Sequence, residues 1–206
     1  TSIASVLIHK KNNYLDVNII KDYIFYVISG VLAGTVFAAL MQTKSLVLFF
    51  SVVVYFLGTY LLLNSNKVQK AKKKFDLLPR LFFGFVSGFV SAPMGIGGAV
   101  MNVPVLRYFG YPIKKAIGSA AAIGFIIALF GAIGFLISGS FLKANLPLSI
   151  GFINIPAFLI FVPITTFMAR VGANSVNKID KSKVQSLFGV FLYVVGTIFI
   201  YRYLSL

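Results

Sequence analysis

Long apolar runs constrain this chain more than any other feature. A helix that crosses the ~30 Å hydrocarbon core of a bilayer needs about 20 predominantly apolar residues. Lipid offers no hydrogen-bond partners, so only helices and closed barrels cross it, and barrel strands would alternate apolar with polar residues. Five continuous runs approach or exceed the helical length: 23–41, 45–63, 113–138, 147–168 and 184–204. The sequence therefore predicts an all-α polytopic membrane protein.

Composition excludes several classes of function. The chain is 59% hydrophobic and 11% charged, with no cysteine and a single histidine, His9, which we expect in a polar loop. It has no glutamate, and its acids lie in or beside polar stretches: Asp16, Asp22, Asp76 and Asp180. An enzyme would need a nucleophile with a base, or a set of metal ligands. We therefore expect no enzyme activity, no cofactor and no metal site.

The net charge of +15 has two interpretations. A nucleic-acid groove needs a long basic patch, commonly with aromatic residues between the charges, and no segment here provides one. The basic residues instead collect in short polar stretches between apolar runs, where Lys and Arg mark the cytoplasmic side of membrane proteins. We expect the lipid bilayer as the environment and no nucleic-acid partner.

One apolar stretch is broken in its middle. Residues 87–110 read SGFVSAPMGIGGAVMNVPVLRYFG, and the hexapeptide Pro93–Gly98 is a poor helix former, because proline lacks an amide hydrogen and glycine is conformationally free. We expect one short helix at 80–92 and another at 98–108. The stretch either crosses the membrane once, or turns at the break and leaves on the side where it entered.

Loop charges distinguish these two geometries. A single crossing places 11 Lys and Arg residues on one side and 8 on the other, whereas a re-entrant hairpin gives 16 and 3. The positive-inside rule favours the second distribution, so the sequence predicts a re-entrant helix pair. A helix that begins at Gly98 would then direct its free amides and positive dipole end into the membrane interior, where they can bind an anion.

An internal repeat divides the chain. FFSVVVYFLGT at 49–59 aligns with LFGVFLYVVGT at 187–197, an offset of 138, and both contain Y-x-x-G-T. We interpret 1–63 as the C-terminal part of a first transmembrane repeat, 64–79 as a basic cytoplasmic linker and 80–206 as a second repeat. Each repeat would hold a broken re-entrant pair and about three transmembrane helices, the first repeat being incomplete. An odd number of crossings inverts one half relative to the other, as in many secondary transporters.

Two stretches resemble a known family. GIGGAVMNVPVLRYFGYPIKKAIGSAAA at 95–122 resembles the repeated signature of the sulfite exporter TauE/SafE family, in which a glycine-rich break precedes an apolar stretch, Pro-x-Leu, a basic loop and Ala-x-Gly-Thr-Ser. The segment from 146 to 192, with its small-residue turn, a proline and a Gly-Ala, resembles the family's closing segment. Two departures are Ala99, in place of a third glycine, and Gly118-Ser119-Ala120, in place of Gly-Thr-Ser.

The resemblance covers the whole chain and implies both a missing segment and a function. Thr1-Ser2 is similar to the end of the first Gly-Thr-Ser element, so one broken segment is expected upstream. The implied function is a secondary transporter that exports a small anion, such as sulfite, sulfoacetate or a similar organosulfur anion, across the bacterial inner membrane by alternating access. The alternative is an anion channel or a permease of an unrelated substrate. Whether the protein forms a homo-oligomer stays open.

Candidate substrate-binding residues surround the break: Gly95, Gly97, Gly98, Asn102, Ser91 and Ser119. The glycines either cradle an anion or permit a tight turn, and the asparagine either contacts substrate or hydrogen-bonds another helix. The serines either face a cavity or bond to their own helix. Pro93 and Pro104 are expected to fix the break and the exit. Weaker candidates are Asn154, Thr165 and Thr166, and three cations that set orientation or attract anions to the cytoplasmic mouth: Arg107, Lys114 and Lys115.

Overall fold

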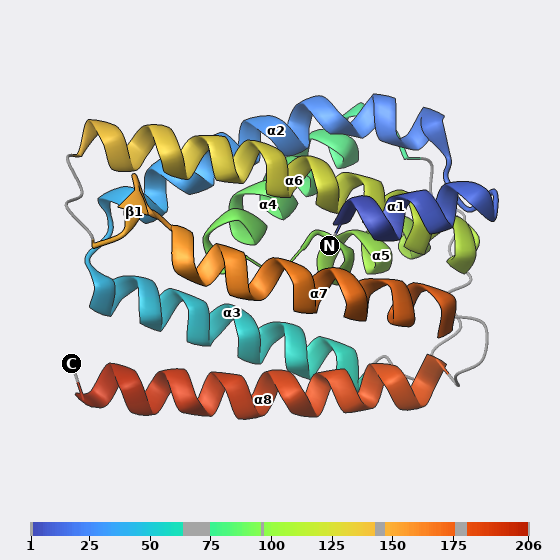
Figure 1. Cartoon of the computed structure of the whole chain (residues 1–206). Helices are drawn as coiled ribbons and strands as arrows, with labels where there is room; N and C mark the ends of the chain where they lie inside the picture. Colours follow the sequence, from blue (N-terminus) through green and yellow to red (C-terminus); the bar gives the residue numbers. More distant parts are fainter. Residues whose placement is uncertain (1, 64–74, 96, 143–146, 176–180, 206) are drawn as a thin grey trace. The chain divides into compact units, whose positions relative to one another are not determined.

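The computed structural model describes residues 2–63, 75–95, 97–142, 147–175 and 181–205 (Figure 1). Its elements in chain order are α1 (Ser2–Lys11), α2 (Val17–Leu40), α3 (Thr43–Leu63), α4 (Leu77–Met94), α5 (Ala99–Tyr108), α6 (Ile113–Phe141), β1 (Ser149–Ile150), β2 (Ile153–Asn154), α7 (Ile155–Ser175) and α8 (Lys181–Ser205). Among the described residues, α2, α3, α4, α6 and α7 are long and apolar enough to cross a membrane. The prediction of an all-α polytopic membrane protein is thus confirmed.

The expectation that His9 lies in a polar loop is wrong. Helix α1 continues to Lys11, and α2 already begins at Val17. The turn after α1 contains Asn13, whose φ of 55° is a left-handed conformation that commonly ends helices. His9 is consequently buried within α1 and is not a loop residue.

Two other boundaries differ from expectation. The run at 147–168 begins with a β-hairpin, in which Ser149 pairs with Asn154, before α7 starts. Gly151 supplies the turn with a φ of +57°, and the Asn154 side chain accepts a hydrogen bond from the amide of Ala157 at 3.0 Å, as a helix N-cap does. The predicted linker lies mostly outside the described residues, and α4 begins within it, at Leu77.

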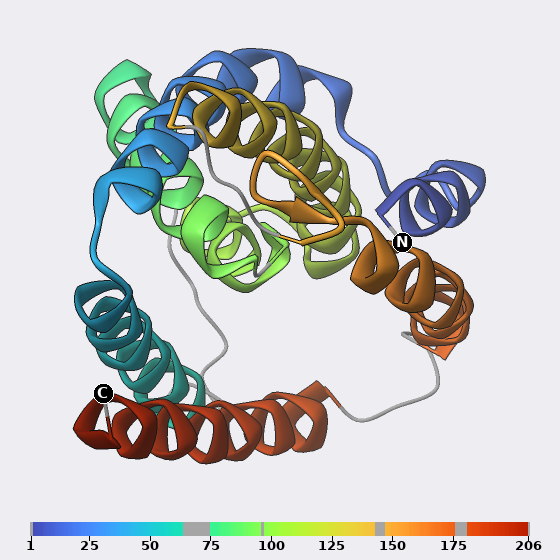
Figure 2. The same cartoon turned by 60° about the vertical axis from the view of Figure 1, so that its left-hand side comes forward.

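The chain separates into two compact units. One contains α3 and α8, which lie side by side along their lengths (Figures 1 and 2). The other contains α1, α2, α4, α5, α6, α7 and the hairpin. Each unit therefore takes helices from both halves of the sequence, and the predicted repeat boundaries stay a prediction.

Glycines bring α2 and α4 into close contact. A Cβ at Gly30 or Gly34 would collide with the carbonyls of Phe85 or Phe89, and a Cβ at Gly88 would collide with the carbonyl of Val27. The GxxxG spacing in α2 thus has the close-packing role that small residues have in membrane helices. Pro93, four residues after Phe89, has no amide to donate to the Phe89 carbonyl.

The two helices of the broken segment turn back on themselves. The Phe75 ring, just before α4, lies 4.6 Å from the Phe109 ring, just after α5, and 6.2 Å from that of Tyr111 (centroid distances). The start of the segment therefore meets its end, which is the hairpin geometry that the loop charges favour. Helix α6 packs against both α4 and α5.

The contact between α2 and α4 yields a stability prediction. Gly30→Ala should lower the free energy of unfolding by about 1–3 kcal/mol, because the new methyl overlaps the Phe85 backbone. The matched control is Gly172→Ala in α7, where a Cβ would meet nothing within 4 Å. Thermal unfolding of detergent-purified protein compares the two variants. Equal midpoints would contradict the packing described here.

Candidate functional site

The helix break begins at Gly95. Helix α4 continues through Pro93 to Met94, so the predicted break at Pro93 is two residues too early. The backbone reverses at Gly95, whose φ of 60° is left-handed and whose amide contacts the Ala92 carbonyl at 3.4 Å. Pro104 lies inside α5 and does not end it. A proline near a helix end removes only one amide, whereas glycine alone adopts positive φ without strain.

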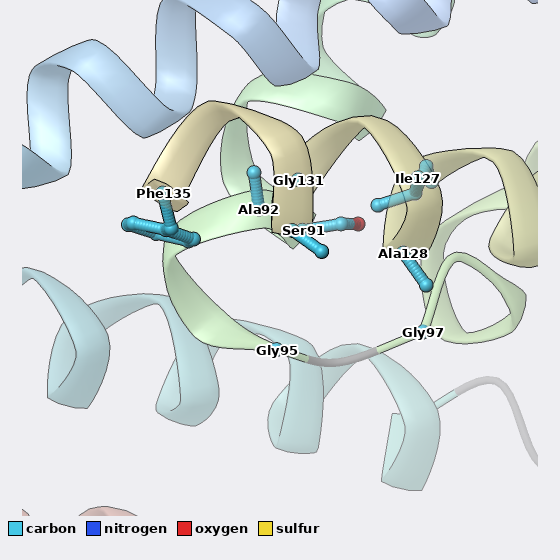
Figure 3. A pocket seen from close by; sticks show the side chains of 9 residues that line it. Ser91, Ala92, Gly95, Gly97, Ile127, Ala128, Gly131 and Phe135 are labelled. Carbon is cyan, nitrogen blue, oxygen red and sulfur yellow. The ribbon is translucent and has the colours of Figure 1, made fainter. Parts of the chain in front are cut away.

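A cavity of about 190 Å³ lies against the break (Figure 3). Its walls come from α4, the break itself and α6: Ser91, Ala92, Gly95, Gly97, Ile127, Ala128, Gly131, Ala132 and Phe135. At ~30 Å³ per water molecule, this volume matches about six waters or a small solute. None of the described residues that line it carries a charge.

Ser91 is the polar side chain of this cavity. It is 3% exposed, and its hydroxyl has no hydrogen-bond partner among the described residues. Figure 3 shows the hydroxyl directed toward the α6 wall near Ile127 and Ala128. A buried hydroxyl without a partner costs about 1–3 kcal/mol. Ser91 is therefore poised to hydrogen-bond whatever enters the cavity.

Asn102 ties the break together and does not line the cavity. Its Nδ2 donates to the carbonyl of Gly98 at 2.6 Å, and its Oδ1 accepts from the Ser87 hydroxyl at 2.9 Å. Both side chains are fully buried. Of the two roles open for Asn102, the geometry fits the interhelical hydrogen bond. Sequence reasoning missed Ser87, although its spacing of four residues from Ser91 places both hydroxyls on one face of α4.

The remaining glycines have different surroundings. A Cβ on Gly98 would lie 2.6 Å from Cδ1 of Ile127 and 2.7 Å from Nδ2 of Asn102, and Gly124 of α6 faces the amide of Gly98 at close range. Because Gly98 and Gly124 have no side chains, the break packs closely against α6. Gly97 differs, because a Cβ there would meet nothing within 4 Å. Gly98 is thus a packing position, whereas Gly97 borders the open cavity.

Comparison with known proteins identifies the family. The family profile described as Sulfite exporter TauE/SafE matches residues 1–199. The chain belongs to the sulfite exporter TauE/SafE family. It is a membrane transporter family, and its member here is a multi-pass protein of the bacterial cell membrane. The resemblance based on the glycine-rich break and the basic loop is confirmed.

Curated relatives share this assignment. A probable membrane transporter protein of Haemophilus influenzae is 33% identical over 71% of this chain and 56% of its own length. A probable membrane transporter protein of Methanocaldococcus jannaschii is 25% identical, over 68% of this chain and 54% of its own. YunE of Bacillus subtilis, a probable membrane transporter protein, is 23% identical over 98% of this chain and 77% of its own length. The chain thus spans about half the length of the first two relatives. No solved structure matches.

The TauE/SafE element at Gly118-Ser119-Ala120 does not line the cavity. The buried Ser119 hydroxyl accepts a hydrogen bond from the amide of Asp16 at 3.1 Å. A Cβ on Gly118 would collide with the carbonyl of Tyr14. In this chain the element therefore fastens the connection between α1 and α2 to the start of α6. Ser119 is the one candidate binding residue that the structure places away from the break.

Charged groups gather where α2, α4 and α6 begin. Arg80 pairs with Asp22 at 2.9 Å, and Lys115 pairs with Asp16 at 3.4 Å. Burial raises the pKa of the nearby Tyr111 phenol, Arg80 opposes that rise, and both aspartates add to it. These ion pairs link the three helix starts at the end of the unit where the α4–α5 hairpin opens. Of the other cations considered, Lys114 lies 5.4 Å from the Tyr14 ring centroid.

The weaker candidates also find local roles. Asn154 caps α7 and contacts the hairpin. Thr165 donates to the Phe161 carbonyl of its own helix at 2.7 Å. Neither residue lines the described cavity.

The buried polar tie predicts coupled stability effects. Ser87→Ala and Asn102→Ala should each lower the free energy of unfolding by about 1–3 kcal/mol, because each leaves a buried polar partner unsatisfied. The double variant should be less destabilised than the sum, since both substitutions remove one shared bond. Denaturation in detergent provides the measurement. Ser140→Ala, which removes an exposed hydroxyl bonded to its own helix, is the control. Strictly additive losses of stability in the double variant would contradict the hydrogen bond between Ser87 and Asn102.

Proposed function

We propose that this chain is part of a secondary transporter that exports a small anion, such as sulfite, sulfoacetate or a similar organosulfur anion, by alternating access. The observation that carries the proposal is the cavity at the helix break, with the unpartnered Ser91 hydroxyl in its wall. Membership of a transporter family supports the same interpretation. Binding to lipid follows from the exposed apolar helices.

The cavity suits an anion although it has no cationic side chain. Helix α5 begins at Ala99, two residues after Gly97, which is part of the cavity wall. The amides of its first turn have no carbonyl partner within the helix and form the positive end of the helix dipole. Such helix starts bind anions, and the apolar walls strengthen the interaction by excluding water. A neutral site of this kind also releases its substrate more readily than a fixed ion pair.

Inverted repeats would give this site alternating access. The hairpin formed by α4 and α5 enters and leaves at one end, which supports the re-entrant geometry. The Y-x-x-G-T motifs of α3 and α8 lie on helices that run in opposite directions, since Phe50 meets Phe199 and Leu62 meets Gly189. Opposed equivalent helices are what two inverted halves would provide. Rocking of one half against the other would open the cavity to each side in turn.

Transport measurements test the site. In proteoliposomes that hold the full chain, Ser91→Ala should raise the KM for sulfite about tenfold, because the substrate loses one hydrogen bond to a charged group. Gly97→Val should abolish flux while the protein still folds, since Gly97 lines the cavity and a Cβ there would meet no atom within 4 Å.

The control is again Ser140→Ala, which should leave KM unchanged. Wild-type flux that saturates and shows counterflow supports a carrier. Current that grows linearly with sulfite would favour the channel alternative. Normal flux in Gly97→Val would remove the cavity from the mechanism.

Labelling tests the re-entrant geometry. Asp76, before α4, and Lys114, at the start of α6, are both exposed. In this cysteine-free chain each can be replaced singly, as Asp76→Cys and Lys114→Cys. Both should react with a membrane-impermeant maleimide from the same side of oriented vesicles, because the hairpin returns to its side of origin. Ser140→Cys, at the other end of α6, should react from the opposite side. Reaction of Asp76→Cys and Lys114→Cys from opposite sides would overturn the hairpin.

A further inference from the structure

Helices α3 and α8 hold each other through a reciprocal pair of hydrogen bonds. The Tyr55 hydroxyl lies 2.8 Å from Oγ1 of Thr197, and the Tyr193 hydroxyl lies 2.5 Å from Oγ1 of Thr59. These four residues are the tyrosines and threonines of the two Y-x-x-G-T motifs. Each motif thus supplies a tyrosine to the threonine of the other. We call the four residues the Tyr–Thr clasp.

The direction of each bond follows from the proton count. Thr59 donates its hydroxyl proton to the carbonyl of Tyr55 at 2.8 Å, and Thr197 donates to the carbonyl of Tyr193 at 2.9 Å. A threonine hydroxyl has one proton to give. Each tyrosine must therefore be the donor in the bond between the helices. In each helix the threonine donates to a backbone carbonyl of its own helix, and the tyrosine donates to the threonine of the other helix. The two motifs are therefore equivalent in chemistry as well as in spacing.

Packing around the clasp is reciprocal too. A Cβ on Gly58 would lie 3.1 Å from the Tyr193 ring, and a Cβ on Gly196 would lie 3.1 Å from the Tyr55 ring. The two tyrosine rings meet edge to face, with centroids 5.2 Å apart. When residue i contacts j and the equivalent of j contacts the equivalent of i, a two-fold axis relates the partners. That local axis passes between the two tyrosines.

The orientation of this axis has a functional meaning. Helices α3 and α8 are antiparallel, because Lys44 near the start of α3 lies over the ring of Tyr203 near the end of α8. A two-fold axis that relates antiparallel helices is perpendicular to both. Helix α3 is long and apolar enough to cross a membrane and α8 lies alongside it, so this local axis would lie in the membrane plane. An inverted-repeat carrier has an axis of that orientation between its halves.

We infer that the Tyr–Thr clasp sits on the axis between the two halves and sets the balance between the inward-open and outward-open states of the carrier. The inference rests on the proposed carrier function. Each state places the two halves in unequal environments, and the clasp already differs between its ends: the bond at Tyr193 is partly buried and the bond at Tyr55 is exposed. Exchange of the states exchanges these environments. Loss of one bond then penalises one state, and loss of its equivalent penalises the other.

The experiment uses the pair Tyr55→Phe and Tyr193→Phe. An Ala128→Cys reporter in the cavity wall is labelled in proteoliposomes by an impermeant maleimide, added to one side or the other without substrate. We expect the ratio of labelling rates to shift in opposite directions in the two variants, by at most about fivefold, which is the full effect of one neutral hydrogen bond. The double variant should return close to the parental ratio. Thr197→Val should shift the ratio in the same direction as Tyr55→Phe, and Thr59→Val in that of Tyr193→Phe.

Controls separate a positioning role from a merely structural one. Tyr201→Phe, at an exposed position of α8, should not change the ratio, and thermal midpoints identify any variant that misfolds. Shifts in the same direction, or no shift in well-folded variants, would overturn the inference. Because the assay contains no substrate, opposite shifts without sulfite flux in the parent would leave the clasp intact and refute the proposed substrate. Sulfite flux without opposite shifts would support the proposed substrate and overturn the inference about the clasp.

Discussion

The fold around the cavity depends on one constraint: backbone groups freed by a helix break cannot rely on water in an apolar interior. Asn102 meets this constraint at the break, because the Gly98 carbonyl accepts from both its amide and its side chain. The Phe89 carbonyl, which loses its amide donor at Pro93, packs closely against Gly34. The Ser91 hydroxyl, by contrast, has no partner among the described residues.

Two cations of this unit form ion pairs away from the cavity. Arg80 and Lys115 are committed to aspartates where the helices begin, apart from the cavity wall. There they fasten α2, α4 and α6 and contribute to the basic character of that end. In the proposed anion site the helix dipole takes the place of a charged side chain, and a dipole attracts an anion less strongly than a lysine does. The proposed carrier would benefit from that moderation, since it must bind its substrate on one side and release it on the other.

Local chemistry predicted much of this structure, and long-range contacts account for the rest. The length of the apolar runs predicted the long helices, and the Pro/Gly hexapeptide predicted the break. The exact start of the break was missed, because α4 continues through Pro93 to Met94 and the chain turns only at Gly95, inside the predicted hexapeptide. Ser87 was missed and the partner of Ser119 was not foreseen, because the residues they bond, Asn102 and Asp16, are 15 and 103 residues away in sequence.

Gly97 carries a further consequence. Its backbone needs no left-handed conformation, and a side chain there would meet no neighbour within 4 Å. Gly95 and Gly98, on either side, lack that freedom, since one turns the chain and the other packs on α6. Position 97 is therefore where mutation can resize the cavity without rebuilding the scaffold. Directed evolution of the proposed transporter's selectivity would therefore begin most directly at this position.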